Sequence, residues 1–491
     1  MRKVLATIII LLIATTAFAF DGFTDIFDSD DSFFETTSVE VKQQKLGLNG
    51  ALSFNLEGMA DTSGKEINTS INGGLNLDLN WKGSIVDAKA TLDLIPKTDR
   101  TNMEWIDIFT TLSISTFFDW GRVEAGLLKK EWGSGDGIHV VDPLNAPDYR
   151  NGLVDDPLQM KMAEPMVMGT ATLRDTSIDV IYKPMLIPMV AAESEKSRWL
   201  MPSPINPADI YSKLTSFGVD ESWDFKYQVN TPEADELAKL SHSQWGARVK
   251  TTLGPADLGI IYYNGFYTTP SFKIGNIQEI IESLTVNAAD KKLKVEIDLA
   301  FTRAQLFGLE ATVVTGPLTF MLEGGFWLSE DYKGNDPLKY NNKAVYLAGV
   351  GFTIPKTSAY FSFTYSGEYI LNFVEGDIVV QDPLNPFDIQ IGDADYIQSL
   401  VSSNGKPYMN TLTAAFELPL AREKVNVRLG ATYQIETKGY AIFPSVKWNL
   451  ADDVQIKAVG RFFGTFDNFI PSMFNKWSKN DSLTVGISYL F

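Results

Sequence analysis

Hydrophobic and polar residues alternate one by one along most of the chain. The final stretch, SLTVGISYLF, places Leu483, Val485, Ile487, Tyr489 and Phe491 on one face and mostly small polar residues on the other. A period of two predicts β-strands with one apolar and one polar face. The pattern recurs in residues 46–56, 71–81, 86–94, 425–434 and 454–462, whereas helical periodicity is weak and confined to residues 276–288. We therefore predict an all-β chain.

The connections between the predicted strands alternate between short and long. About eight short turns are rich in the Gly, Pro and Asp that suit tight turns. They are found at residues 81–84, 119–122, 173–177, 253–257, 315–318, 354–358, 419–424 and 450–453. Long acidic connections lie between them, and the largest span residues 131–161, 184–240, 269–291 and 371–406. This layout predicts about 18 strands, with about 16 as the alternative.

The apolar strand faces need an apolar environment. In a lipid bilayer every backbone polar group must be paired within the protein, so strands cross it only as a closed barrel. The apolar faces would meet lipid, and the polar faces would line a lumen that is wide enough for an aqueous channel at about 16 to 18 strands. The predicted fold is a transmembrane antiparallel up-and-down β-barrel over residues 45–491, with short periplasmic turns and long extracellular loops.

The first residues predict export. After MRK comes an apolar run too short for a secure membrane helix, and then Ala17-Phe18-Ala19, which fits a cleavage site. Residues 1–19 are therefore predicted to be a signal peptide. Residues 20–44 are acidic with interspersed Phe, and we expect a periplasmic tail or, as the alternative, a small hatch inside the barrel. Together with the strands, this leader predicts a location in the bacterial outer membrane.

Composition argues against several kinds of function. The net charge of −19 disfavours nucleic-acid binding, and the absence of Cys excludes disulfides. The chain has only two histidines, His139 and His242, and neither lies in a hydrolase motif or in a pair with zinc-ligand spacing. We therefore expect no catalytic residue, no cofactor and no enzymatic activity.

One long connection has an unusual composition. It opens with WGSGDGIHVVDPLNAPDY, residues 132–149, and shortened echoes occur near Asn206 and Asn385. The carboxylates of Asp136, Asp142 and Asp148 are weak calcium candidates, because the ligand order of an EF-hand is absent. Gly, Pro, Asn and Asp also fix turns, and we favour a stiff loop that narrows the lumen. The residues expected to shape this constriction are Trp132, Asp136, His139, Asp142, Asn145 and Asp148.

Charged residues occupy many predicted lumen positions. By strand parity the inward basic residues are Arg122, Lys130, Arg248, Lys250, Arg428, Lys447, Lys457 and Arg461. The inward acidic residues are Asp78, Asp87, Asp93, Asp107, Glu124 and Glu436. Rows of charge facing a pore set ion preference. Alternatively, the charges form mutual salt bridges that stabilise the barrel wall and discriminate little between ions. The sequence leaves both hypotheses open.

The constriction loop also resembles a known motif. Residues 126–149 are similar to the WG..DG....D.LN..D pattern of bacterial outer-membrane porin-like barrels, a superfamily that includes alginate-type exporters. The match is carried by Gly126, Trp132, Gly133, Asp136, Gly137, Asp142, Leu144, Asn145 and Asp148, and the departures are at Leu127-Leu128, His139 and Ala146-Pro147. The resemblance implies a barrel of the porin or exporter kind. The last strand, which ends at Phe491, resembles the signal by which the outer-membrane assembly machinery recognises barrels.

The expected function is passive diffusion of small hydrophilic solutes through a lumen narrowed by infolded loops. Two alternatives stay open. One is a transporter for hydrophobic or bulky substrates, with residues 20–44 as the hatch. The other is a surface adhesin or polysaccharide-binding barrel whose long loops are the active part.

Overall fold

The protein is described here by a computed structural model. It describes residues 45–60, 67–94, 108–154, 157–192, 197–200, 215, 219–285, 287–334, 336, 339–355, 357–373, 379–380, 389–390, 406–467 and 472–491. The predicted signal peptide, residues 20–44, Asp107 and the echoes near Asn206 and Asn385 lie outside the described residues.

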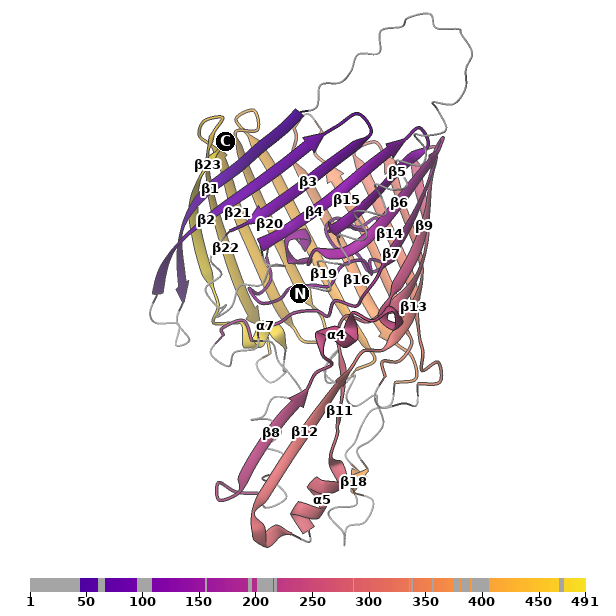
Figure 1. Cartoon of the computed structure of the whole chain (residues 1–491). Coiled ribbons are helices and arrows are strands. Elements are labelled where there is room, and N and C mark those ends of the chain that lie inside the picture. Colours follow the sequence, from indigo (N-terminus) through magenta and orange to yellow (C-terminus); the bar gives the residue numbers. More distant parts are fainter. Residues whose placement is uncertain are drawn as a thin grey trace, which may run out of the picture.

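Antiparallel strands form one closed 18-stranded barrel (Figure 1). Each strand pairs with the next barrel strand, and the first also pairs with the last through Ala51–Met59 and Ser482–Leu490. The strands are β1 (Lys45–Ala60), β2 (Ile67–Lys82), β3 (Val86–Asp93), β4 (Phe109–Phe118), β5 (Gly121–Leu128), β6 (Glu164–Leu173), β7 (Thr176–Lys183), β9 (Gln244–Leu253), β10 (Ala256–Phe266), β13 (Arg303–Thr315), β14 (Leu318–Ser329), β15 (Lys343–Thr353), β16 (Tyr360–Ile370), β19 (Tyr408–Leu420), β20 (Val425–Gln434), β21 (Gly439–Asn449), β22 (Val454–Thr465) and β23 (Ser482–Leu490). The predicted count of 18 is confirmed.

Side chains alternate between the outer wall and the lumen. On β23, Leu483 and Ile487 are 55% and 48% exposed on the outer wall, whereas Ser482 is 3% exposed and faces inward. Exposed aromatic side chains gather near both ends of the outer wall. Trp120, Trp448 and Tyr489 lie near the short turns, and Trp245, Tyr369 and Tyr408 lie near the long loops. The exterior is therefore an apolar belt between two aromatic rims.

The connections follow the predicted alternation. All the predicted short turns join neighbouring strands at one rim, at the top of Figure 1, which we call the short-turn rim. At the other end, the long-loop rim, the largest described connections join β5 to β6, β7 to β9, β10 to β13 and β16 to β19. Glycine supplies the left-handed turn dihedral at Gly254 and Gly316, whose φ angles are 61° and 58°, whereas Arg174 and Ala421 adopt it in two other short turns.

A small sheet projects beyond the long-loop rim. Strand β8 (Asp224–Asn230) pairs in parallel with β12 (Lys292–Ala300), which pairs antiparallel with β11 (Ser271–Ile274). Helix α5 (Ile277–Thr285) lies on the sheet, so Ile280 and Leu284 are buried against Val295 and Ile297. Strand β12 therefore belongs to this sheet, and the next strand along the chain, β13, belongs to the barrel. The weak helical pattern at residues 276–288 is confirmed as α5.

The other described elements are short. They are α4 (Ala234–Leu237), α7 (Met473–Lys476), 3-10 turns at Pro157–Met160, Leu240–His242 and Ala288–Asp290, and the paired strands β17 (Val379–Val380) and β18 (Ile389–Gln390). No helix among the described residues has both the length and the apolar character needed to cross a membrane.

Candidate functional site

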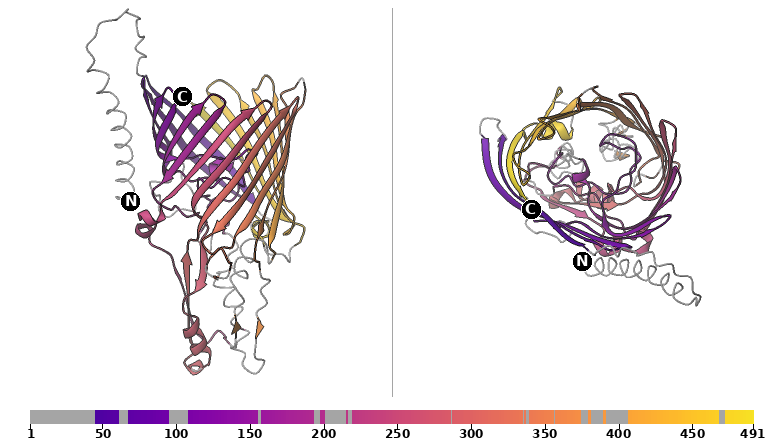
Figure 2. Two further views of the ribbon diagram at one scale, coloured as in Figure 1. Left: turned by 90° about the vertical axis from the view of Figure 1, so that its right-hand side faces the viewer. Right: turned by 90° about the horizontal axis from the view of Figure 1, so that it is seen from above.

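The connection between β5 and β6, residues 129–163, folds back into the barrel; we call it the lumen loop (Figure 2). Its Trp132 is fully buried and packs with Val141 and Leu144 against the inner wall. Strands β6, β7, β10, β13, β14 and β15 supply that wall with Met166, Met168, Ile181, Ile261, Tyr263, Ala304, Leu306, Trp327 and Val345. Without the loop this inward apolar patch would face water, so burial of its area fixes the position of the loop.

Glu323 of β14 anchors the lumen loop. Its side chain is fully buried, and its carboxylate accepts hydrogen bonds from backbone N–H groups of the loop, among them Ser134 (2.7 Å) and Val140 (2.7 Å). Nδ1 of His139 lies 3.1 Å from Oε1. Gly133 has a φ of +121°, and a Cβ there would lie 2.5 Å from Oε1, so only glycine fits. Charge-assisted hydrogen bonds to one carboxylate therefore hold this turn.

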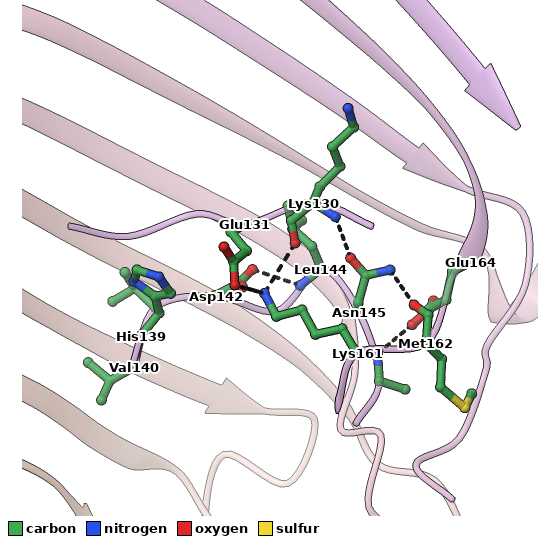
Figure 3. A network of polar contacts seen from close by, with 12 residues as sticks. Lys130, Glu131, His139, Val140, Asp142, Leu144, Asn145, Lys161, Met162 and Glu164 are labelled. Carbon is green, nitrogen blue, oxygen red and sulfur yellow. Dashed lines mark hydrogen bonds and ion pairs between the residues drawn. The ribbon is translucent and has the colours of Figure 1, made fainter. Parts of the chain in front are cut away.

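Asn145 ties the two ends of the lumen loop together (Figure 3). Its side chain accepts a hydrogen bond from the backbone N–H of Lys130 (2.8 Å) and donates to the carbonyls of Leu128 (2.9 Å) and Met162 (2.8 Å). Asparagine suits this place because its amide can donate and accept at once. The residue therefore fixes where the loop leaves β5 and returns to β6.

Asp142 adds an ion pair beside this junction. Its carboxylate contacts the ammonium of Lys161, which also lies 3.0 Å from the carboxylate of Glu131 (Figure 3). Asp142 itself accepts a hydrogen bond from the backbone N–H of Leu144 (3.2 Å). These contacts keep the outgoing and returning parts of the loop side by side.

A buried ion pair holds the middle of the loop on the wall. Nζ of Lys183 on β7 lies 2.7 Å from the carboxylate of Glu164 on β6, and both side chains are almost completely buried. Glu164 also accepts a hydrogen bond from the backbone N–H of Ala146 (2.5 Å), and Lys183 donates to the carbonyl of Leu144 (2.9 Å). The two buried charges therefore compensate each other and bind the loop backbone.

The far end of the lumen loop reaches a distant part of the wall. Arg461 of β22 donates a hydrogen bond to the carbonyl of Asn151 (3.1 Å) and pairs with Glu57 of β1 (2.7 Å). Attached at β14 and at β22, the loop crosses the lumen. Because Glu57 lies on the first strand and Arg461 on the last but one, their ion pair also spans the seam where the barrel closes.

A second connection meets the lumen loop near Arg461. Trp199, from the connection between β7 and β9, is buried against Phe463 and Trp477, with ring centroids 5.6 and 5.5 Å away. Its ring also packs on Gly152 of the lumen loop, where a Cβ would lie 2.3 Å from the ring. The guanidinium of Arg461 lies 4.8 Å from the ring centroid of Trp199. The two connections therefore form one packed layer across part of the lumen.

An open space remains beside this layer. A cavity of about 640 Å³ lies between the lumen loop and the inner wall of β2, β3 and β4. Both signs of charge line it: Asp78, Lys89 and Asp93 on the wall, and Lys129, Asp148, Arg150 and Lys161 on the loop. Asp148 pairs with Arg150 (2.6 Å). Apolar side chains such as Phe109 and Met162 line the rest of the cavity, so its lining is mixed.

The predicted lumen charges divide into paired and unpaired groups. The pairs are Arg248 with Asp179 (2.7 Å) and Glu310 (3.6 Å), Lys130 with Glu124 (2.5 Å), Lys250 with Asp257 (3.7 Å) and Arg461 with Glu57. Within the described part of the chain, Arg122, Arg428 and Lys447 have no ion-pair partner, and Lys447 lies in register with Lys457. Ion pairs therefore involve some of the predicted lumen charges, and the effect of these charges on ion preference stays a prediction. Glu436 is an exception, because it binds Asn410 on the outer wall (2.6 Å).

The carboxylates considered for calcium have other partners. Asp142 pairs with Lys161, Asp148 pairs with Arg150, and Asp136 is hydrogen-bonded to Tyr360 of β16. Over the described ranges, no group of three or more His, Asp or Glu side chains is arranged to hold a metal ion. The carboxylates of the loop are used to position it.

Sequence reasoning missed Glu323 and Trp199 as loop contacts. One signal was present in the strands. Gly308 of β13 and Gly325 of β14 face the lumen, and a Cβ on either would lie 3.3 and 3.1 Å from the side chain of Val141. Glycine within a strand often marks the close approach of another segment. Two such glycines on neighbouring strands indicate where the lumen loop packs against the inner wall.

Comparisons with known proteins find a distant likeness in architecture. A mutant of the Rh. blastica porin has a TM-score of 0.34 and 10% identity, covering 91% of this chain and 100% of that one. A loop-deletion mutant of OmpT, an outer membrane protein of Vibrio cholerae, has a TM-score of 0.34 and 8% identity, covering 91% and 99%. No family model and no curated protein matches the chain. The motif resemblance of residues 126–149 is therefore not confirmed.

Proposed function

We propose that the protein is a channel of the bacterial outer membrane through which small hydrophilic solutes diffuse passively. The observation that carries the proposal is the lumen loop, which crosses the barrel from Glu323 to Arg461 and leaves beside it a cavity bordered by charges of both signs. A closed barrel with an apolar belt outside and charged groups inside supports it, because strands satisfy all their backbone groups in lipid only when they close into a barrel. The lumen loop is then the constriction.

The rims set the orientation that we propose. Short turns face the periplasm and long loops face the cell exterior in single-chain outer-membrane barrels. Exposed aromatic side chains near both rims, such as Trp120 and Trp245, suit the two membrane interfaces. The small sheet of β8, β11 and β12 then stands outside the cell. The closing strand β23, which the terminal residue Phe491 follows, is our candidate for recognition by the barrel assembly machinery.

Passage would occur between the lumen loop and the wall of β2 to β4. Asp78 and Asp93 on the wall and Arg150 and Lys161 on the loop border the same space, so a solute there meets both signs of charge. Polar lining groups replace part of the hydration shell of a solute without binding it tightly, which suits diffusion. The many anchors of the loop keep the width of this passage constant.

Conductance in planar bilayers tests the proposal. We expect the purified protein to give discrete, ohmic current steps, and proteoliposomes to admit small neutral sugars but exclude larger ones. A closed barrel without current in either orientation would contradict it.

The alternative function, in which the long loops bind surface ligands, is favoured by one observation, the small sheet with its own apolar core around Val295. That alternative predicts low current from a fully folded barrel.

The contact between His139 and Glu323 predicts a pH dependence. Burial lowers the pKa of His139, but the hydrogen bond to Glu323 and the charges of Glu323, Asp142 and Glu131 outweigh it and raise the pKa above 6.5. The ionic contact is therefore complete at acid pH and is lost as pH rises through the raised pKa. We expect fluctuations of the open current to increase as pH rises above 6.5 and through this raised pKa, and His139→Gln to remove the dependence. An unchanged pH profile in the variant would assign the titration to another group.

A further inference from the structure

The outer wall has an apolar groove on strands β16, β19, β20 and β21. Its volume is about 500 Å³, and Ala414 and Ala431, which are in register on neighbouring strands, form its floor. Phe363, 40% exposed, and Ile442, 37% exposed, stand beside the floor on the flanking strands. Two small side chains between larger ones therefore leave a furrow in the lipid-facing belt.

Aromatic side chains keep the groove open toward the long-loop rim. The ring of Tyr440 lies over Gly464, where a Cβ would be 2.4 Å from it, so the ring leans away from Ala431. Phe466 is 75% exposed and contacts the rings of Tyr440 and Tyr433, with centroids 5.1 and 6.0 Å away. These contacts hold the rings as a wall instead of letting them collapse onto the alanines.

A polar cluster lies next to the groove on the same face of the barrel. Oδ1 of Asn410 accepts hydrogen bonds from the hydroxyls of Tyr346 (2.6 Å) and Tyr365 (2.7 Å). The backbone and side-chain N–H groups of Asn410 donate to the carboxylate of Glu436 (2.6 and 2.7 Å). Leu412, which lines the groove, follows Asn410 on the same face. The groove therefore runs from hydrocarbon depth to a hydrogen-bonding site near the long-loop rim.

We propose that this groove binds one fatty acyl chain of a membrane lipid, with the polar head of the lipid beside Asn410 and Glu436. The proposal rests on the membrane location given above. A second copy of the barrel fits less well, because the protruding rings of Phe363 and Phe466 keep another backbone from reaching Ala414 and Ala431, and close backbone approach is what favours helix or strand contact in lipid. A single chain is narrow enough to lie between the rings.

Filling the groove tests the proposal. The full-length protein is reconstituted in vesicles of palmitoyl-oleoyl phosphatidylethanolamine, extracted in mild detergent and analysed by native mass spectrometry. We expect an adduct of one lipid with the wild type, and about tenfold lower occupancy after Ala414→Leu and Ala431→Leu together. The control is Ala348→Leu, an exposed outer-wall alanine of β15 outside the groove, which should retain the adduct. Heat-modifiable electrophoretic mobility reports whether each variant is a folded barrel.

Three results would overturn the proposal. One is equal adduct in folded wild type and in the folded double variant, and another is equal loss in the Ala348→Leu control. The third is a lipid-free wild-type oligomer that dissociates in the double variant, because the face would then be an interface between copies. If the double variant does not fold, Ala431→Leu alone replaces it. Conductance is recorded in parallel and should be the same in the wild type and the variants. If the wild type shows no channel activity, the proposed function is contradicted, but the lipid adducts of the folded proteins can still be compared.

Discussion

Replacing residues 133–160 of the lumen loop by a short Gly-Ser linker is expected to raise the single-channel conductance about threefold or more, since an 18-stranded barrel has a wide aqueous lumen and the loop crosses it. The loop now crosses that lumen from Glu323 on β14 to Arg461 on β22. Current should also lose any preference between ions that depends on charges of the loop such as Arg150 and Lys161. Planar-bilayer recording measures both effects.

A matched control separates the constriction from loop shortening in general. Residues 271–300 form most of the small sheet outside the barrel, and replacing them by a linker of the same kind should leave conductance unchanged. Glu323→Gln is a smaller perturbation of the lumen loop than its replacement. It keeps the shape of the side chain but removes the negative charge of the carboxylate that accepts hydrogen bonds from several loop N–H groups. We expect larger fluctuations of the open-channel current in this variant. Equal conductance of wild type and the folded loop-replacement variant would exclude the loop as the element that sets the pore width.

Strand alternation made most of the barrel predictable. Each strand has an apolar outer face and a polar face toward the lumen, so apolar and polar residues alternate along it, as at Leu483, Val485 and Ile487. The residue types of the turns then indicated the short-turn rim, because Gly254 and Gly316 adopt positive φ angles that glycine adopts more readily than other residues. The polar residues of the lumen loop could also be picked out from the sequence, since Asn145 and Asp142 contact residues of the same loop or its flanking strand.

The parts that could not be predicted depend on partners distant in sequence. Glu323 is one of many inward acidic residues, and nothing near it indicates that its donors come from Ser134 and Val140. The small sheet was missed because β8 is short and lies inside a long connection, and its parallel partner β12 looks like the start of the next barrel strand. Local periodicity reports a strand but not the sheet that it joins.

Breaking the buried ion pair of Lys183 and Glu164 is expected to cause the largest loss of barrel stability. Lys183→Met leaves the carboxylate of Glu164 buried without its counter-charge, which costs about 3–5 kcal/mol for a pair of this kind. Glu164→Gln leaves the ammonium uncompensated and should cost a similar amount. Guanidinium unfolding of the barrel in lipid vesicles, followed by tryptophan fluorescence, measures both free energies.

The double variant decides between an electrostatic and a packing role for the pair. With Glu164→Gln and Lys183→Met together no charge is left unpaired, and Gln can still accept the hydrogen bond from Ala146 that Glu164 accepts now. The double variant should therefore be more stable than either single variant, which requires a coupling larger than the about 3–5 kcal/mol lost in one single variant. It still loses the bond from Lys183 to the carbonyl of Leu144, so its open current should fluctuate more than that of wild type. Additive losses from the two substitutions would instead mean that each side chain is held by packing alone, and the lumen loop would then owe its position to Glu323 and Trp132.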